Sequence, residues 1–228
     1  MVIQEVGVMG VKPGINIMDP STPEGNILHQ AWSTVLTKPG GPSRVYYGLE
    51  EDNPIRIWGF FDWDTVEQHE KFAIEYGADA VKEIPKICTH GEFTKHVIMD
   101  PSSDVFQSPV TDVLVAYFPM DFPQTEKDKA AVRLQDVLTK TFGSCSDVAK
   151  LAHGWGVEND FPVKGEQVAD GQLGTALMGF VGWSDDLVQM GFRHTVAFRE
   201  AVSQIHDMEG LVSLEIASLR CKSLERQA

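Results

Sequence analysis

The chain has 228 residues, 43% hydrophobic and 23% charged, so it is long enough for one large domain or two of roughly 110 residues. Its 33 acidic and 19 basic residues give a net charge of -14, which would repel both nucleic-acid phosphates and an anionic lipid surface. The sequence has no apolar run that approaches the roughly 20 residues needed to cross a bilayer. It has an early Glu5 and no basic leader, and its three cysteines form no CxxC pair, so we expect a cytoplasmic protein.

Hydrophobic periodicity predicts six elements in the first half of the chain. The pattern alternates between periods of 2 and 3.6 residues, which are typical of strands and helices respectively. The predicted elements are a strand at 2–11, a helix at 26–37, strands at 43–49 and 55–63, a helix at 64–81 and a strand at 92–98. Asp64 is expected to cap the second helix.

The second half repeats this order. Its predicted elements are a strand at 112–118, a helix at 126–141, strands at 148–157 and 175–183, a helix at 185–205 capped by Ser184, and a strand at 211–219. The letters VLTK recur at 35–38 and 137–140, and GFFDW at 59–63 is matched by GFVGW at 179–183. An extra glycine-rich, polar run near 159–174 predicts an inserted loop, which is either a binding segment or surface decoration.

The repeat predicts an α+β fold built from two tandem ferredoxin-like (βαββαβ) units, residues 1–107 and 108–228, with the boundary near Ser108. Such a unit leaves one face of its sheet bare. We therefore expect the two sheets to pack face to face as an intramolecular dimeric α+β barrel. The chain would then be a monomeric pseudo-dimer, or a homodimer of such chains.

The strand-to-helix passages resemble those of the dimeric α+β barrel superfamily, specifically its antibiotic-biosynthesis-monooxygenase-like and stress-responsive A/B barrel groups. The passages are Gly59 to Phe72, with Trp63 and His69, and Gly179 to Leu187, with Trp183. Tandem members of this type are similar to fungal proteins of secondary metabolism or detoxification. The resemblance implies a small-molecule pocket between the sheet and the two helices of a unit, but the fold does not name the reaction.

Four residues are candidate acid–base catalysts. His69 lies six positions after Trp63, on a helix where relatives carry an inward His or Tyr, and His194 lies near the equivalent place in the second half. Tyr47 and His153 occupy matching positions on the second strand of each half. Imidazole and phenol groups facing each other across a ligand could exchange protons near neutral pH. For each residue, a packed or exposed structural role is the alternative.

Aromatic side chains near these positions would give the flat apolar walls that an aromatic ligand needs, although each could equally be core. We predict as substrate-binding residues Tyr46, Phe61, Trp63, Phe72, Tyr117, Trp183 and Phe192.

The sequence lacks the motifs GxGxxG after a strand, GxxxxGK[ST], HExxH and GxSxG, and its seven histidines have no regular ligand spacing, so no cofactor or metal is expected. We predict a cofactor-independent enzyme that cyclises, isomerises, decarboxylates or oxygenates a hydrophobic, phenolic or polyketide-derived molecule. The alternatives are a non-catalytic stress-responsive ligand-binding protein and a haem protein of the chlorite-dismutase type. Only one half is expected to keep a functional pocket.

Overall fold

The computed structural model describes residues 2–165 and 168–226. By their contacts these residues form two compact units. The N-terminal unit comprises Val2–His96 together with residues 221–226, and the C-terminal unit comprises Val97–Arg220. This division differs from the boundary predicted near Ser108, because Val97 and Asp100 form bridges with Gly156 and His153, and the last strand of the chain pairs within the N-terminal unit. Each unit is described by itself.

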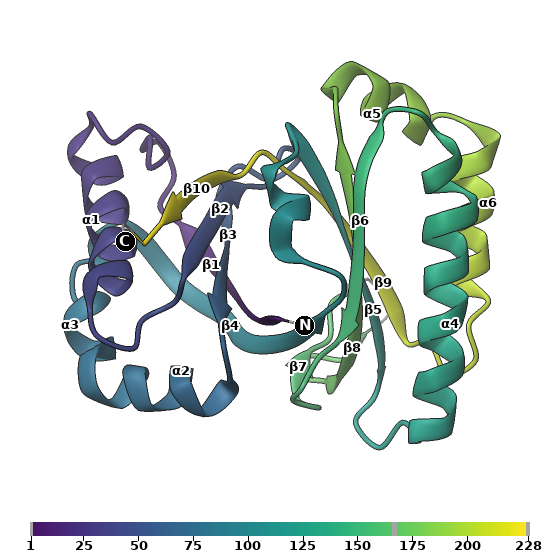
Figure 1. The fold of residues 1–228 in the computed structure, drawn as a ribbon, viewed down its shortest axis with the longest axis horizontal. Helices are drawn as coiled ribbons and strands as arrows, with labels where there is room; N and C mark the ends of the chain where they lie inside the picture. The colour runs from purple at the N-terminus through teal and green to yellow at the C-terminus, as the bar shows by residue number, and fades with distance from the viewer. Residues whose placement is uncertain (1, 166–167, 227–228) are drawn as a thin grey trace. The chain divides into compact units, whose positions relative to one another are not determined.

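The N-terminal unit has the predicted βαββαβ order (Figure 1). Its elements are β1 (Val2–Val11), α1 (Pro23–Thr37), β2 (Arg44–Leu49), β3 (Arg56–Trp63), α2 (Val66–Phe72), a π-helical turn (Ala73–Gly77), α3 (Ala78–Ala80), a 3-10 turn (Ile84–Lys86) and β4 (Cys88–Met99). In Figure 1, α2 lies across the direction of α1 instead of beside it.

The sheet of the N-terminal unit has the order β10-β2-β3-β1-β4. Its first member, β10 (Lys222–Glu225), comes from the end of the chain and was not predicted. It pairs antiparallel with β2, and the Arg226 guanidinium donates to the carbonyls of Leu36, Lys38 and Gly41. A short strand of this kind gives little periodicity, so only its tertiary pairing defines it.

The C-terminal unit repeats the order with a longer helical layer. Its elements are a 3-10 turn (Ser103–Gln107), β5 (Val110–Pro119), α4 (Gln124–Lys140), a 3-10 turn (Phe142–Ser144), β6 (Val148–Trp155), β7 (Phe161–Pro162), β8 (Leu173–Trp183), α5 (Asp186–Arg193), α6 (Val196–His206) and β9 (Ser213–Leu219). The sheet order is β6-β8-β5-β9, and β7 also pairs with β8. The helices α4 and α6 lie side by side along the sheet (Figure 1).

The predicted inserted loop at 159–174 is partly a strand. Phe161 and Pro162 of β7 pair with Gly174 and Leu173 of β8, so this part of the insertion extends the sheet. Residues 166–167 lie outside the described residues.

The two predicted second helices are each interrupted. The helix at 64–81 passes through the π-helical turn, and that at 185–205 breaks where Thr195 caps the start of α6. The predicted caps are one residue early. Thr65 Oγ1 accepts the Gln68 N–H and Asp185 Oδ1 accepts the Val188 N–H, because each following residue is the first with helical geometry.

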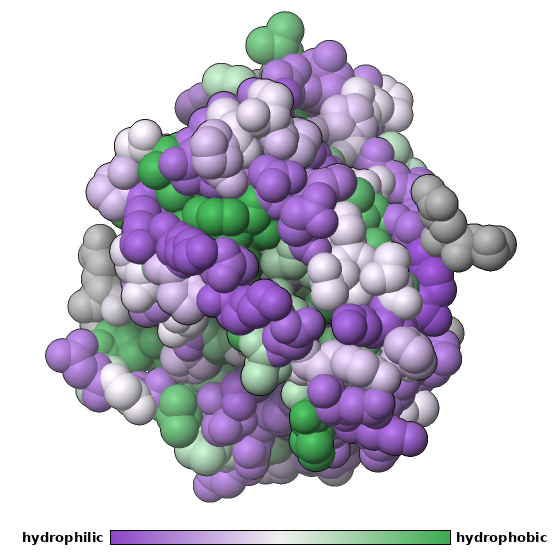
Figure 2. Space-filling model, turned by 90° about the vertical axis from the view of Figure 1, so that its left-hand side faces the viewer, coloured by the Kyte–Doolittle hydropathy of each residue, from purple (hydrophilic) through white to green (hydrophobic). Residues whose placement is uncertain are grey.

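Each unit has its own apolar core between one face of its sheet and its helices. The face of the N-terminal unit that bears α1 and α3 is shown in Figure 2, where hydrophobic side chains lie in a hollow rimmed by hydrophilic ones. Among the described helices, none is long and apolar enough to span a membrane.

Candidate active site

A carboxyl group lies in the core of the N-terminal unit. Strand β1 alternates, and Glu5 falls on its helix-covered face with Ile3, Gly7 and Met9. The Glu5 side chain is 11% exposed, and its Oε2 accepts the indole N–H of Trp63 at 2.7 Å. A buried carboxyl group with only one donor is costly to ionise.

Two histidines complete a line of titratable groups with Glu5. The His69 Nε2 on α2 lies 3.4 Å from Glu5 Oε2, and its Nδ1 lies 2.7 Å from His96 Nε2 on β4. The His69 ring also packs on Trp63, with ring centres 4.9 Å apart. A proton can therefore pass along Glu5, His69 and His96 after only small movements, since the longest gap slightly exceeds a hydrogen bond.

Burial raises the pKa of Glu5 from 4.5 to about 7, although the Trp63 hydrogen bond and the charge of His96 act in the opposite direction. Burial thus favours the protonated form of this carboxyl group over the form that an exposed glutamate takes at neutral pH. A general acid or base works best when its pKa lies near the working pH. This cluster is suited to proton transfer.

The C-terminal unit has a matching cluster of different chemistry. Asp112 on β5 takes the place of Glu5, and its Oδ2 accepts the indole N–H of Trp183 at 3.0 Å. Gln189, six positions after Trp183 as His69 is after Trp63, donates to Asp112 Oδ1 at 2.7 Å. Ser218 Oγ also donates to Oδ1, and Arg193 forms an ion pair with it at 3.0 Å. The Asp112 carboxylate is therefore compensated, and no histidine contributes to this cluster.

The predicted residues of the N-terminal unit fall on both faces of its sheet. His69, Phe61, Trp63, Phe72 and Tyr47 lie on the helix-covered face. The last four are no more than 6% exposed and pack as core, so they fill the space over β2 and β3 in which they were predicted to contact a ligand. Desolvation raises the pKa of Tyr47.

Tyr46 lies on the opposite face of that sheet, fully buried. Its hydroxyl accepts a hydrogen bond from Arg44 Nη1 at 2.6 Å. Because neighbouring residues of a strand point to opposite faces, Tyr46 and Tyr47 cannot line the same space.

The predicted residues of the C-terminal unit do not form an acid–base site. His194 is exposed at the end of α5, because the helix break turns it outward, so it does not point inward as predicted. His153 pairs with Gly179 as Tyr47 pairs with Gly59, which confirms that they occupy equivalent positions. Desolvation lowers the pKa of His153, and the charge of Asp100 opposes that shift.

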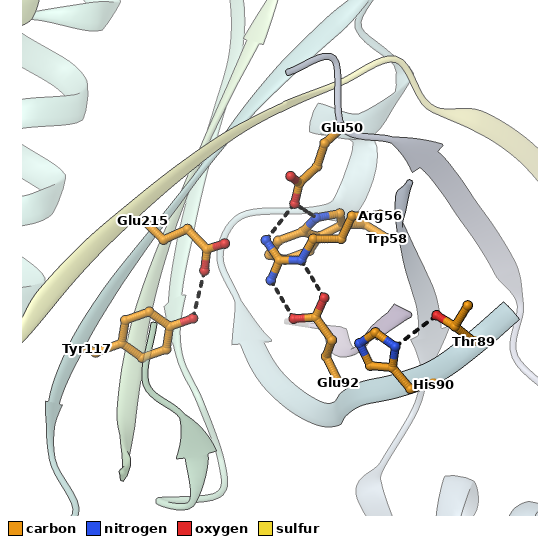
Figure 3. A network of polar contacts seen from close by, with 8 residues as sticks. All are labelled: Glu50, Arg56, Trp58, Thr89, His90, Glu92, Tyr117 and Glu215. Atoms are coloured by element: carbon orange, nitrogen blue, oxygen red, sulfur yellow. Dashed lines mark hydrogen bonds and ion pairs between the residues drawn. The ribbon is translucent and has the colours of Figure 1, made fainter. Parts of the chain in front are cut away.

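The predicted aromatic residues of the C-terminal unit also have structural contacts. Trp183 and Phe192 pack with ring centres 5.1 Å apart in the core. Tyr117 lies on the opposite face, where its hydroxyl donates to Glu215 at 2.9 Å (Figure 3).

Sequence reasoning missed Glu5 and His96 as site residues. The signal for Glu5 was present, because it is the one charged residue on the apolar alternation of the first strand. His96 gives no comparable signal, since only sheet pairing brings β4 beside β1.

A second polar network lies on the opposite face of the N-terminal sheet (Figure 3). Arg56 donates from Nε and Nη2 to Glu92 at 2.8 and 3.0 Å and from Nη1 to Glu50 at 2.7 Å. Glu50 also accepts the indole N–H of Trp58 at 2.6 Å. All three guanidinium nitrogens are thereby engaged, so we assign this network to stability.

Two surface cavities of the N-terminal unit flank the turn at Pro39. One of about 590 Å³ lies between α1 and β10, and one of about 490 Å³ lies beside α2. Of the predicted site residues, only Phe72 lines either of them. The described residues contain no cluster of three or more His, Cys, Asp or Glu side chains that could hold a metal ion.

No model of a known protein family and no curated protein matches this chain. Solved structures do match it. An anthrone oxidase-like protein superposes with a TM-score of 0.69 at 12% identity, covering 100% of this chain and 94% of its own. A proposed monooxygenase from Fusobacterium nucleatum gives a TM-score of 0.60 at 13% identity, covering 100% and 95%. One from Lactobacillus acidophilus gives 0.58 at 12%, covering 100% and 97%.

These likenesses confirm the predicted fold class. The chain has an α+β fold of two ferredoxin-like units in tandem. Within that class it shares its fold over the full chain with the anthrone oxidase-like protein and with the two proposed monooxygenases. At 12–13% identity the likeness describes the fold and not the reaction.

Proposed function

We propose that this protein is an acid–base enzyme whose active site is the Glu5–His69–His96 cluster of the N-terminal unit. The fold is that of small-molecule, enzyme-like proteins. The observation that carries the proposal is the line of three titratable groups, each within 3.4 Å of the next, one of them a buried carboxyl group. The C-terminal unit has no such line among its described residues.

In the proposed mechanism Glu5 removes a proton from an acidic C–H or O–H group of the substrate. His69 then accepts that proton from Glu5 and shares it with His96, which restores the base. Trp63 holds the carboxyl group in place through its N–H. Each of these steps uses only side chains of the protein.

The substrate class we propose is a phenolic or polyketide-derived aromatic molecule, handled in the cytoplasm. Two observations support it: the aromatic surroundings of Glu5 and the likeness to an anthrone oxidase-like protein. Anthrone has a CH₂ group made acidic by the neighbouring carbonyl and rings. Loss of one proton gives an enolate, which either regains a proton as the phenolic tautomer or reacts with dioxygen, so that CH₂ and O₂ become C=O and H₂O.

Anthrone tests the two steps separately. Without oxygen, in D₂O, the purified protein should speed the exchange of the CH₂ protons, followed by NMR. In air, it should speed the formation of anthraquinone, followed by absorbance. The His69→Gln variant, which copies Gln189, should lose exchange activity by about 10²-fold or more. His194→Ala, a surface histidine, should retain it. Equal exchange by all three proteins would refute the proposal.

A second candidate function is ligand binding without turnover. It is favoured by the two surface cavities beside Pro39, which none of Glu5, His69 and His96 lines. Binding of a hydroxyanthraquinone together with no exchange of anthrone protons would select this alternative.

A further inference from the structure

Two glycines face each other on the helix-covered side of the N-terminal sheet. Gly7 of β1 and Gly59 of β3 are direct cross-strand partners. A Cβ atom at Gly59 would lie 3.0 Å from the Phe61 ring and 3.9 Å from the Trp32 ring. A Cβ atom at Gly7 would meet only Thr94 Oγ1, at 3.9 Å, among the described atoms. The surface of the sheet above Gly7 is therefore covered by no side chain other than that of Thr94, and this uncovered area is called the hollow.

This hollow is open to solvent and lies beside Glu5. Three residues of β1 that share this face with Glu5 are partly exposed, namely Ile3, Gly7 and Met9, and Thr94 is exposed. A central strand of a covered sheet is normally buried on its helical face. Because residues two apart on a strand share a face, the Glu5 side chain borders the hollow directly.

The equivalent position of the C-terminal unit is filled. Leu114 pairs with Gly179 as Gly7 pairs with Gly59, and it follows Asp112 by two residues as Gly7 follows Glu5. The Leu114 side chain is 2% exposed in the core, and its neighbours on this face, Val110 and Ala116, are also buried. The two units thus differ at this position, which is a glycine with partly exposed neighbours in one unit and a buried leucine with buried neighbours in the other.

We propose that Gly7 determines specificity by leaving room for a flat aromatic ring above the Gly7–Gly59 pair, with the ring edge toward Glu5. The Thr94 hydroxyl lies at the rim, where it can hydrogen-bond a phenol or carbonyl oxygen of the ligand. The ligand class is a planar hydroxylated polycyclic aromatic compound. This inference rests on the proposed function for the role of Glu5, but the hollow itself does not.

Binding of 1,8-dihydroxyanthraquinone, a probe that lacks the acidic CH₂ group, tests the hollow independently of catalysis. Titration followed by absorbance should show that the wild-type protein binds it. Gly7→Leu should weaken binding at least 30-fold, Gly7→Ala by a few fold, and Thr94→Val by about 3- to 10-fold. Glu5→Gln should still bind the probe.

Gly191→Leu provides the matched control, since no described atom lies within 4 Å of the Cβ position of Gly191 on α5, and that of Gly7 has one neighbour, at 3.9 Å. Its binding should be unchanged, and thermal melts should show that all variants are folded. Failure of the wild-type protein to bind, or wild-type affinity in Gly7→Leu, would overturn the inference. Loss of binding in Gly7→Leu, with no anthrone exchange by any protein, would keep the hollow and refute the catalytic proposal.

Discussion

The two units share one fold but differ in what they bury at the same place. In the N-terminal unit, Glu5 accepts a hydrogen bond from one indole and lies in line with two histidines. The next residue on that face of β1 is Gly7, whose Cβ position has one neighbour, at 3.9 Å. In the C-terminal unit an Asp receives four donors, one of them from Arg193, beside a buried Leu114. Burial with few donors raises the pKa of a carboxyl group, whereas hydrogen bonds and an ion pair to the ionised form oppose that shift. The same position in the two units thus holds carboxyl groups in different environments, and the proposed function assigns chemistry to the one in the N-terminal unit.

The largest difference should appear in activity. Glu5→Gln keeps an acceptor for the Trp63 N–H but removes the base, so anthrone proton exchange should fall by about 10²- to 10⁴-fold. The Asp112→Asn variant should exchange anthrone protons at the wild-type rate under conditions where it is folded. Equal losses in both variants would show that the two clusters do not differ in role.

Substitutions at the two equivalent positions, Gly7 and Leu114, should differ in their effect on the free energy of unfolding. Leu114→Ala should lower the free energy of unfolding by about 2 to 5 kcal/mol, because it leaves a cavity in a closed core. Gly7→Ala should change it by no more than about 1 kcal/mol, since its Cβ enters open space. Urea denaturation measures both. A large loss in Gly7→Ala would mean that the hollow is not open.

The pH dependence of stability should identify Glu5. Its pKa is about 7 in the folded protein against an ordinary 4.5, so between these values the folded state holds a proton that the unfolded chain releases. The contribution of Glu5 therefore falls as pH rises from 5 to 8, by up to about 3 kcal/mol. The difference in the free energy of unfolding between the wild type and Glu5→Gln should change by this amount between pH 5 and pH 8, with the variant relatively more stable at pH 8. Parallel curves would contradict the raised pKa.

The smallest effect concerns the terminal strand, which only the N-terminal unit receives. Arg226→Ala removes the donor to three carbonyls at and after the end of α1, so stability should fall by about 1 kcal/mol. Lys222→Ala serves as a comparison on the same strand, where one backbone contact to Met18 is lost. Hydrogen exchange of β2 amides should report both changes, and unchanged protection in Arg226→Ala would show that the guanidinium does not fasten the strand.

The sequence predicted the tandem βαββαβ order, the strand-to-helix passages after Trp63 and Trp183, and the equivalence of Tyr47 and His153. These follow from periodicity and from local repeats, which neighbouring residues determine. His69, which the sequence singled out as a candidate catalyst, contacts Glu5 and His96, and its catalytic role stays a prediction. The helix breaks at the π-helical turn and at Thr195, and the strands β7 and β10, were missed because they are short.

Only the tertiary structure brought together Glu5 of β1, His69 of α2 and His96 of β4, and only it distinguished Gly7 from Leu114. The sequence by itself determined most of the strands and helices, because that choice depends largely on side chains a few positions apart. The pKa of a carboxyl group and the space above a glycine depend instead on desolvation and on atoms from distant segments, which packing alone provides.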